Sequence, residues 1–483
     1  MELISENLKL ILGKSNDIVF TEIYINGDER ITATLLFVDG LIDRNAVNND
    51  ILKPLAEESK LSKSKNIKDI IELINHGAVY YHAQKIRNNL DDVINDVLTG
   101  NTALIFDKEK TALTFDTRDY EKRSITEPTN ESVIKGAKDS FIENLRTNTA
   151  TVRNKIQTKN LIIRETIIGK QTLTPVAMVY MDGITNIDLV NEVKERLDKI
   201  DIEGITSVGF IEEYIIERKY SPFPQVISTE RPDKFCANIL EGRIGIIIGG
   251  YPVSYIIPAT LAQFFQAPED YGQNYINGSF IRILRYVLLF ITLLLPAIYI
   301  VLVQFNQGMI PSELAISIAS TEEGVPFPSF IQVIFMVLAF EVLQEAGIRL
   351  PRITGQIVPI VGALIVGDAA VKASMISPIV VIIIAATAVA SYTMPNDDVR
   401  LALRVWRLLV IILSSILGLI GLSIGIILFL HHLCRIETFG IPYLSPFAGI
   451  DREELKDTLI RLPLSWYKKR PPTLKSANKR RQK

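Results

Sequence analysis

Hydrophobicity divides this 483-residue chain into two parts with different solvent preferences. The first part, up to about Gly278, is charged and mixed in composition. The second part, from about Ile281 to Leu433, contains long apolar runs such as Val287–Phe305 and Leu408–Leu430. Runs of this length with so few charges are typical of segments that cross a bilayer. The sequence therefore predicts a soluble module followed by an α-helical polytopic membrane domain.

The soluble part contains two segments that align without gaps at an offset of 143 residues. Leu36–Leu41 and Val179–Ile184 are each an apolar run that includes Asp-Gly, followed by a helical pattern. In a second matching pair, Asp96–Gly100 and Asn238–Gly242, a helix ends at a glycine before another apolar run. We therefore predict an α/β module of two related subdomains, with chance similarity of common strand-turn-helix patterns as the alternative. The Asp-Gly pairs are expected as turns rather than as an active site.

Five parts make up the predicted domain organisation. They are an N-terminal arm (1–24), a first α/β subdomain with a helical connector (25–150), a second α/β subdomain with a proline-rich linker (151–280), a transmembrane domain (281–433) and a basic cytoplasmic tail (434–483). No basic segment followed by an apolar core opens the chain, so the soluble module is expected to stay in the cytoplasm. Cys236 and Cys434 do not suggest a disulfide framework.

Charge around the apolar runs indicates the membrane topology. Arg282 and Arg285 lie at the start of the first predicted span, and the following loop, 306–329, contains three glutamates and no lysine or arginine. By the positive-inside rule the soluble module lies inside and this loop outside. The tail carries twelve Lys/Arg and five Asp/Glu, which also favours the inside. Both ends inside require an even number of crossings.

We predict four spans and one shorter helix. The spans cover about 284–305, 330–350, 376–394 and 408–430. The run Ile357–Gly367 has only eleven apolar residues, with a proline and glycines, and is expected as a half-helix or re-entrant segment. This count places a short charged connector, 396–407, outside, where its arginines are unfavourable.

Carboxylates within the apolar part are the candidate functional residues. Glu341 and Glu345 are four residues apart and share one helix face, and Asp368 follows the short helix with Lys372 as its possible partner. Charges at such depth are costly and usually functional, and a net acidic interior favours cations. The structural alternatives are snorkelling to the interface, above all for Glu345, and a packing role for Glu341.

The sequence does not suggest an enzyme. It has no glycine-rich phosphate loop, no zinc-ligand spacing and no nucleophile elbow, and its four histidines do not cluster with acids or thiols. We therefore predict no catalytic residues, no cofactor and no metal. The basic tail is expected to meet anionic membrane lipid rather than nucleic acid.

Several long blocks resemble the A subunit of GerA-type spore germinant receptors. They are RSITEPTNESVIKGAKDSFIENLRTNTA (123–150), YSPFPQVISTERPDK (220–234), FNQGMIPSELAISIAS (305–320), GVPFPSF (324–330) and EAGIRLPRITGQIVPIVGALIVGDAAV (345–371). The resemblance covers the chain from about Arg123 to Phe447 and is weaker in the first hundred residues. Asp368 stands where a glutamine is commoner in the family, and Asn306 where a histidine is common, so ion preference does not transfer directly.

This resemblance implies a multi-pass protein of the endospore inner membrane that works with B and C subunits. It implies a homo-oligomeric ring, expected as a pentamer, that forms a ligand-gated channel for monovalent cations, with the B subunit as the nutrient binder. The alternatives are a secondary transporter, suggested by the broken helix and the intramembrane acids, and a scaffold that anchors a soluble sensor.

The short helix is the predicted gate if the protein is a channel. Small and apolar residues there would permit a constriction that closes by dewetting. The predicted pore and gate residues are Val358, Val361, Gly362, Leu364, Ile365 and Asp368, and the predicted cation path is Glu341, Glu345, Asp368 and Lys372. Signals from the soluble module are expected to reach the membrane through Tyr220–Lys234 and the segment before Ile281.

Overall fold

The computed structural model describes the chain except residues 58–60, 62–65, 80–82, 120–127, 129, 130, 132, 134, 349–356, 449–451 and 483. The described chain divides into two compact units. Unit 1 contains Met1–Glu217, Val226–Ala259 and Ser465–Lys483, and unit 2 contains Arg218–Gln225 and Thr260–Leu464. The chain therefore passes between the units at four points, and the tail expected as one segment from residue 434 is shared between them.

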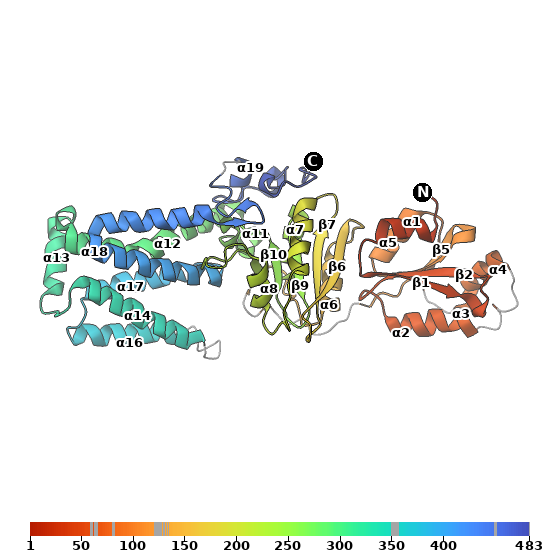
Figure 1. Cartoon of the computed structure of the whole chain (residues 1–483), viewed down its shortest axis with the longest axis horizontal. Helices are drawn as coiled ribbons and strands as arrows, with labels where there is room; N and C mark the ends of the chain where they lie inside the picture. Colours follow the sequence, from red (N-terminus) through yellow and green to blue (C-terminus); the bar gives the residue numbers. More distant parts are fainter. Residues whose placement is uncertain are drawn as a thin grey trace. The chain divides into compact units, whose positions relative to one another are not determined.

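The first subdomain of unit 1 is a five-stranded antiparallel sheet covered by helices on both faces (Figure 1). Its strand order is β1-β2-β4-β5-β3. Its elements are α1 (Ser5–Leu12), β1 (Ile18–Tyr24), η1 (Ile25–Gly27), β2 (Thr32–Val38), α2 (Arg44–Ala46), η2 (Val47–Leu52), α3 (Lys53–Glu57), α4 (Ile67–Leu73), η4 (Ile74–Ala78), β3 (Gln84–Arg87), α5 (Leu90–Leu98), β4 (Thr102–Phe106), η5 (Asp107–Glu109) and β5 (Thr111–Phe115).

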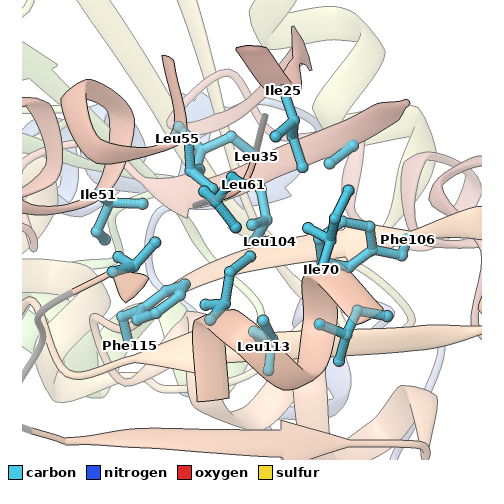
Figure 2. Close-up of a cluster of buried hydrophobic side chains, with 14 of the residues drawn as sticks. Ile25, Leu35, Ile51, Leu55, Leu61, Ile70, Leu104, Phe106, Leu113 and Phe115 are labelled. Atoms are coloured by element: carbon cyan, nitrogen blue, oxygen red, sulfur yellow. The ribbon is translucent and has the colours of Figure 1, made fainter. Parts of the chain in front are cut away.

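Alternation along the strands divides the core of this subdomain into two layers. Leu35, Leu104 and Leu113 point to the face covered by η2, α3 and α4, where they pack with Ile51 and Ile70 (Figure 2). The neighbouring strand residues point to the opposite face, which α1 and α5 cover. The period of two in the sequence thus buries both faces of the sheet.

The second subdomain repeats this topology. Its sheet has the order β6-β7-β9-β10-β8, which is the order of the first sheet with each strand replaced by its counterpart. The predicted duplication is therefore confirmed at the level of topology. Its elements are α6 (Leu145–Lys155), β6 (Leu161–Ile168), β7 (Thr174–Met181), α7 (Ile187–Asp198), α8 (Val208–Ile215), β8 (Ile227–Thr229), α9 (Pro232–Glu241), β9 (Ile244–Ile248) and β10 (Ser254–Ile257).

Unit 2 is mainly a bundle of apolar helices (Figure 1). Three helices in the described chain are long and apolar enough to cross a membrane: Tyr275–Phe305, Ser329–Gly347 and Asp397–Arg435. The elements are α10 (Leu261–Phe264), α11 (Pro268–Gly272), α12 (Tyr275–Ile300) continued by η6 (Val301–Phe305), η7 (Gln307–Met309), α13 (Ser312–Glu322), α14 (Ser329–Ile348), α16 (Ile357–Lys372), α17 (Pro378–Ser391), α18 (Asp397–Arg435), β11 (Glu437–Thr438), β12 (Ile441–Pro442) and α19 (Arg452–Leu455). Two 3₁₀ turns follow, η8 (Leu464–Trp466) and η9 (Pro472–Leu474).

The last helix, α18, is bent back on itself at Gly418. This residue has φ 59° and ψ −133°, which are not helical. The rings of Trp406 and Phe429 lie 5.5 Å apart, whereas 23 residues of continuous helix would separate them by about 35 Å. A Cβ at Gly418 would come within 2.8 Å of the Phe305 ring, so the bend needs glycine for space as well as for its backbone.

Two predictions for the membrane domain are corrected by these helices. The segment 408–430 is not one continuous span, because it contains the Gly418 bend. The segment 396–407 is not a connector, because all but its first residue lie in α18, which Asn396 caps by accepting from the Val399 N–H. In addition, α16 extends to Lys372, beyond the predicted short run.

Candidate functional site

The helix predicted as a gate, α16, has an exposed stripe along one face. Val361 and Ile365 are 45% and 62% exposed, and Asp368 and Lys372 continue the stripe at the helical spacing of three and four residues. The Lys372 ammonium lies 2.7 Å from the Asp368 carboxylate, the partnership predicted from the sequence. Four of the predicted residues thus share one exposed face.

The sides of α16 that flank this stripe pack against α14 and α17. A Cβ at Gly362 would lie 3.0 Å from the Leu343 side chain, and one at Gly367 would lie 2.9 Å from Val381. These glycines therefore serve close helix packing, which differs from the pore position predicted for Gly362. The side chains of Val358 and Leu364, also predicted in the pore, lie outside the described residues.

Glu341 lies at the centre of an ion cluster between α14 and α18. Its carboxylate forms an ion pair with Arg404, at 3.0 Å, and accepts a hydrogen bond from Arg407. Both guanidinium groups are largely buried, and that of Arg407 is only 4% exposed. Two cations around one carboxylate leave this site with a net positive charge, contrary to the acidic interior expected there.

Sequence reasoning missed the two arginines because it placed them in an exposed connector. Their signal was present, since Arg400, Arg404 and Arg407 fall on one face of a helix. The geometry of Glu341 is the packing arrangement considered as an alternative. Its predicted neighbour Glu345 is exposed on the same helix.

At one end of the bundle, Glu322 and Ser377 connect four helices. The Glu322 carboxylate accepts from the Tyr299 hydroxyl at 3.2 Å and from the Ser329 hydroxyl at 2.6 Å, which links α12, α13 and α14. The Ser377 N–H donates to Gln332 at 2.7 Å, which fixes the start of α17 against α14. The start of α17 and the start of α14 are therefore at the same level.

At the other end, the base of α12 is held by buried ion pairs. Asp270 accepts from Arg282 at 3.1 Å and from Arg285 at 2.8 Å, and both Asp270 and Arg282 are fully buried. Arg282 also binds Asp457 at 2.8 Å, close to α19. Breaking such a pair leaves an uncompensated buried charge, so the cluster fixes α12 to two other segments.

A proline-rich loop, 218–225, belongs to unit 2 although its neighbours in sequence belong to unit 1. The Ser221 hydroxyl hydrogen-bonds His432 at 3.0 Å, and the Phe223 ring lies 6.1 Å from those of Phe429 and His432. The loop is therefore attached to the second arm of α18. From Tyr220 onward it overlaps the segment predicted to transmit signals.

The two subdomains of unit 1 are joined by a buried ion pair. Arg153 in α6 is fully buried and donates from Nε to Asp17 at 2.9 Å, and from Nη1 to the Leu161 carbonyl at 3.1 Å. Next to this joint, burial raises the pKa of the Asp39 carboxyl, an effect that Arg44 opposes. Burial also raises the pKa of Glu165, and the charges of Asp17 and Asp39 add to that shift.

These features define a class: a polytopic membrane protein with a duplicated α/β module and an apolar helix that has a partly exposed, charged face. Residues 6–473 match the family described as Bacillus/Clostridium GerA spore germination protein. The chain belongs to this family, and the predicted resemblance is confirmed.

Curated relatives are similar over almost the whole chain. Spore germination protein KA of Bacillus subtilis (strain 168) is 38% identical over 98% of this chain and 86% of its own length. Spore germination protein B1 of the same organism is 36% identical over 96% of this chain and 95% of its own length. A solved structure, the N-terminal domain of the A subunit of the Bacillus megaterium spore germinant receptor GerK3, is 32% identical, covers 54% of this chain and 96% of its own, and gives a TM-score of 0.43.

Proposed function

We propose that this chain is the membrane subunit of a nutrient-responsive spore germinant receptor and that copies of it assemble into a ligand-gated cation channel. The observation that most supports this proposal is the exposed stripe Val361, Ile365, Asp368 and Lys372 on α16. In a lone subunit this stripe would turn an ion pair toward lipid, which is costly in hydrocarbon. Several copies around an axis would turn it toward a shared, water-accessible path.

In such a ring, the apolar and charged ends of the stripe have different roles. Val361 and Ile365 from each copy would form a narrow apolar constriction that closes by dewetting. Asp368 from each copy would form a ring of carboxylates that concentrates cations and repels anions. Nutrient binding at a partner would then shift the population from closed to open rings.

Glu341 has a different role in this proposal. Its charge is held by Arg404 and Arg407, so it is not available to a passing cation. We propose that it fixes α14 to α18 and that Glu345 and Asp368 contribute the negative charge of the path. Replacement of Glu341 by Gln then leaves the reversal potential unchanged and weakens the helix contact.

The bend of α18 suggests six membrane crossings rather than four. α12, α14, α16 and α17 would cross in alternating directions, and the two arms of α18, about 30 and 25 Å long, would cross out and back. This even number puts the soluble module and the tail on the same, cytoplasmic side. It also puts Arg400, Arg404 and Arg407 at the inner side, which removes the conflict with the positive-inside rule.

Membership of this family is the basis for the proposed assembly. We propose B and C receptor subunits as partners, a homo-pentamer as the ring, monovalent cations as the transported species and the endospore inner membrane as the location. Relatives named as spore germination proteins and a germinant receptor A subunit support this assignment.

Ion flux through the reconstituted full chain tests the proposal. Liposomes loaded with K⁺ should release it down its gradient without a co-substrate, and Val361→Ala and Ile365→Ala should increase the release by widening the constriction. Val342→Ala in α14 and Ile382→Ala in α17 are matched controls, because both side chains are exposed but lie outside the stripe. Flux that requires a coupled substrate would indicate a transporter, and no flux in any variant would indicate a scaffold.

A further inference from the structure

The C-terminal segment of unit 1 forms a small hairpin in which positive charges face one another. Lys469 bridges to Arg480 in antiparallel register. The Arg470 N–H donates to the Lys479 carbonyl at 2.9 Å, and the Arg481 N–H donates to the Lys468 carbonyl at 2.9 Å. Three successive cross-strand pairs are therefore each made of two basic residues: 468 with 481, 469 with 480, and 470 with 479.

This arrangement is unfavourable for the isolated hairpin. Like charges directly opposite each other on neighbouring strands are destabilising. Among the ion pairs of the described residues, the one carboxylate that meets these basic pairs is Glu241, which lies 3.3 Å from Arg481. The side chains of Lys468, Lys469, Lys479 and Arg480 are exposed.

Contacts with the second subdomain nevertheless hold the hairpin in this shape. Arg470 donates from Nε to the Leu240 carbonyl at 3.0 Å, and the Ser476 hydroxyl donates to the Glu241 carbonyl at 3.3 Å. Both carbonyls belong to the C-terminal end of α9, where positive charge is favourable. Burial and the charge of Arg481 lower the pKa of Arg470. The fold therefore concentrates positive charge on one surface instead of dispersing it.

We propose that this hairpin binds the surface of an anionic bilayer. Lipid phosphates would supply the negative charge that the three facing pairs lack. Trp466, which is 59% exposed just before the hairpin, would lie at the headgroup level, where tryptophan is favoured. The hairpin belongs to the same chain as the apolar helices of unit 2, and clustered basic residues of membrane proteins attract anionic lipid. This inference does not depend on channel activity.

Fluorescence of Trp466 in the full chain tests this proposal. Trp406→Phe leaves Trp466 as the one tryptophan of the sequence. The protein is placed in nanodiscs of phosphatidylcholine alone, or with about one third phosphatidylglycerol, each containing a brominated phosphatidylcholine as quencher. We expect Trp466 to be quenched in the anionic discs and not in the neutral ones. We also expect about 1 M NaCl, which shortens the Debye length to ~3 Å, to abolish the quenching.

A matched pair of triple variants identifies the residues. Lys468→Gln, Lys469→Gln and Lys479→Gln together should weaken the surface contact by about 100-fold, and quenching should fall to the neutral level. Lys53→Gln, Lys135→Gln and Lys194→Gln remove the same charge from exposed positions of unit 1 and should have no effect.

Three results would overturn the proposal. The first is equal quenching in neutral and anionic discs, and the second is quenching that persists in the tail triple variant or in high salt. The third is a shift of Trp466 emission by a duplex oligonucleotide in neutral discs when anionic lipid causes none, which would make the hairpin a nucleic-acid site.

Discussion

The two subdomains of unit 1 share one sheet topology and the same turn hydrogen bonds, but different segments of the chain cover the turn after the second strand. In both, the Asp of the Asp-Gly turn follows the second strand, and its N–H donates to the residue before the first strand: Asp39 to Asp17 and Asp182 to Asn160, each at 2.7 Å. In both, the helix before the next strand ends at a glycine with positive φ, Gly100 or Gly242. The shared backbone contacts explain why the sequence repeat is clearest at these turns.

The two subdomains differ in the segment that donates a hydrogen bond to the turn after the second strand. In the first subdomain the Asp119 N–H, just beyond β5, donates to the Leu41 carbonyl at 3.2 Å. In the second, the equivalent carbonyl, that of Ile184, accepts from the Ala477 N–H at 3.0 Å. The carbonyl after the Asp-Gly turn is thus bound by a nearby segment in the first subdomain and by the C-terminal segment of the chain in the second. A duplicated fold can therefore acquire a long-range connection by replacing one local segment.

This difference makes the second subdomain the link to the membrane unit. The chain passes between the units after Glu217, Gln225, Ala259 and Leu464, and each of these points borders the second subdomain or the segment that covers it. The first subdomain has no direct passage to unit 2. Motion of the first subdomain can therefore reach unit 2 along the chain only through the second.

The largest predicted effect concerns the joint between the subdomains. Arg153→Met removes the cation that compensates buried Asp17, and we expect a loss of about 3–5 kcal/mol in the free energy of unfolding, measured by denaturant titration. Lys14→Gln removes a pair with Asp182 that also joins the two subdomains but is exposed, and should cost less than about 1 kcal/mol. Equal losses in the two variants would mean that the buried joint is not the main connection.

A second prediction compares the glycines that end the matching helices. Gly100→Ala and Gly242→Ala should each cost about 1–2 kcal/mol, because both residues have left-handed backbone angles. A Cβ at Gly242 would also lie 2.6 Å from the Ser476 hydroxyl, so Ser476→Ala should partly relieve Gly242→Ala, with a coupling of about 1 kcal/mol.

The same Ser476→Ala change should have no coupling to Gly100→Ala, whose Cβ would instead meet Arg118 and Leu41. Two double-mutant cycles, one for Ser476 with Gly242 and one for Ser476 with Gly100, measure the two couplings. Coupling at both glycines, or at neither, would contradict the difference between the subdomains.

A third prediction uses pH at the joint. Burial raises the pKa of Glu165 in the folded state, so its ionised form is penalised there. Glu165→Gln should therefore stabilise the fold at pH 7 and lose this advantage as the pH falls from the raised pKa to the ordinary one, below which wild-type Glu165 is protonated in both states. The gain should be only about a few tenths of a kcal/mol, because part of the side chain is exposed to screening water. A stabilisation by Glu165→Gln that increases as the pH falls would contradict this prediction.

The smallest effect is expected at Cys236 on α9. Burial raises the pKa of this thiol to about 12, so it remains protonated and slow to react at pH 8. In a Cys434→Ser background, its rate of maleimide labelling should rise slightly when the chain ends at Leu464, because the C-terminal end of α9 loses its cap. Rapid labelling of Cys236 in the intact chain would contradict the burial of this thiol on α9.

Sequence reasoning predicted what depends on local pattern and missed what depends on distant contacts. The duplication was visible because the strand, the Asp-Gly turn and the glycine helix end are local. The bend at Gly418 was missed because 23 apolar residues have the length of one span. The role of Ala477 was also invisible, since no local pattern pairs it with Ile184.

Hydrogen exchange in the full chain tests most directly whether the C-terminal segment completes the second subdomain. Exchange would be compared between the intact chain and a chain ending at Leu464. We predict faster exchange of the Gly242 and Arg243 amides, which close the end of α9, and no change at Gly100 and Asn101, which close the end of α5. Unchanged exchange at both helix ends, or equal acceleration at both, would contradict the account.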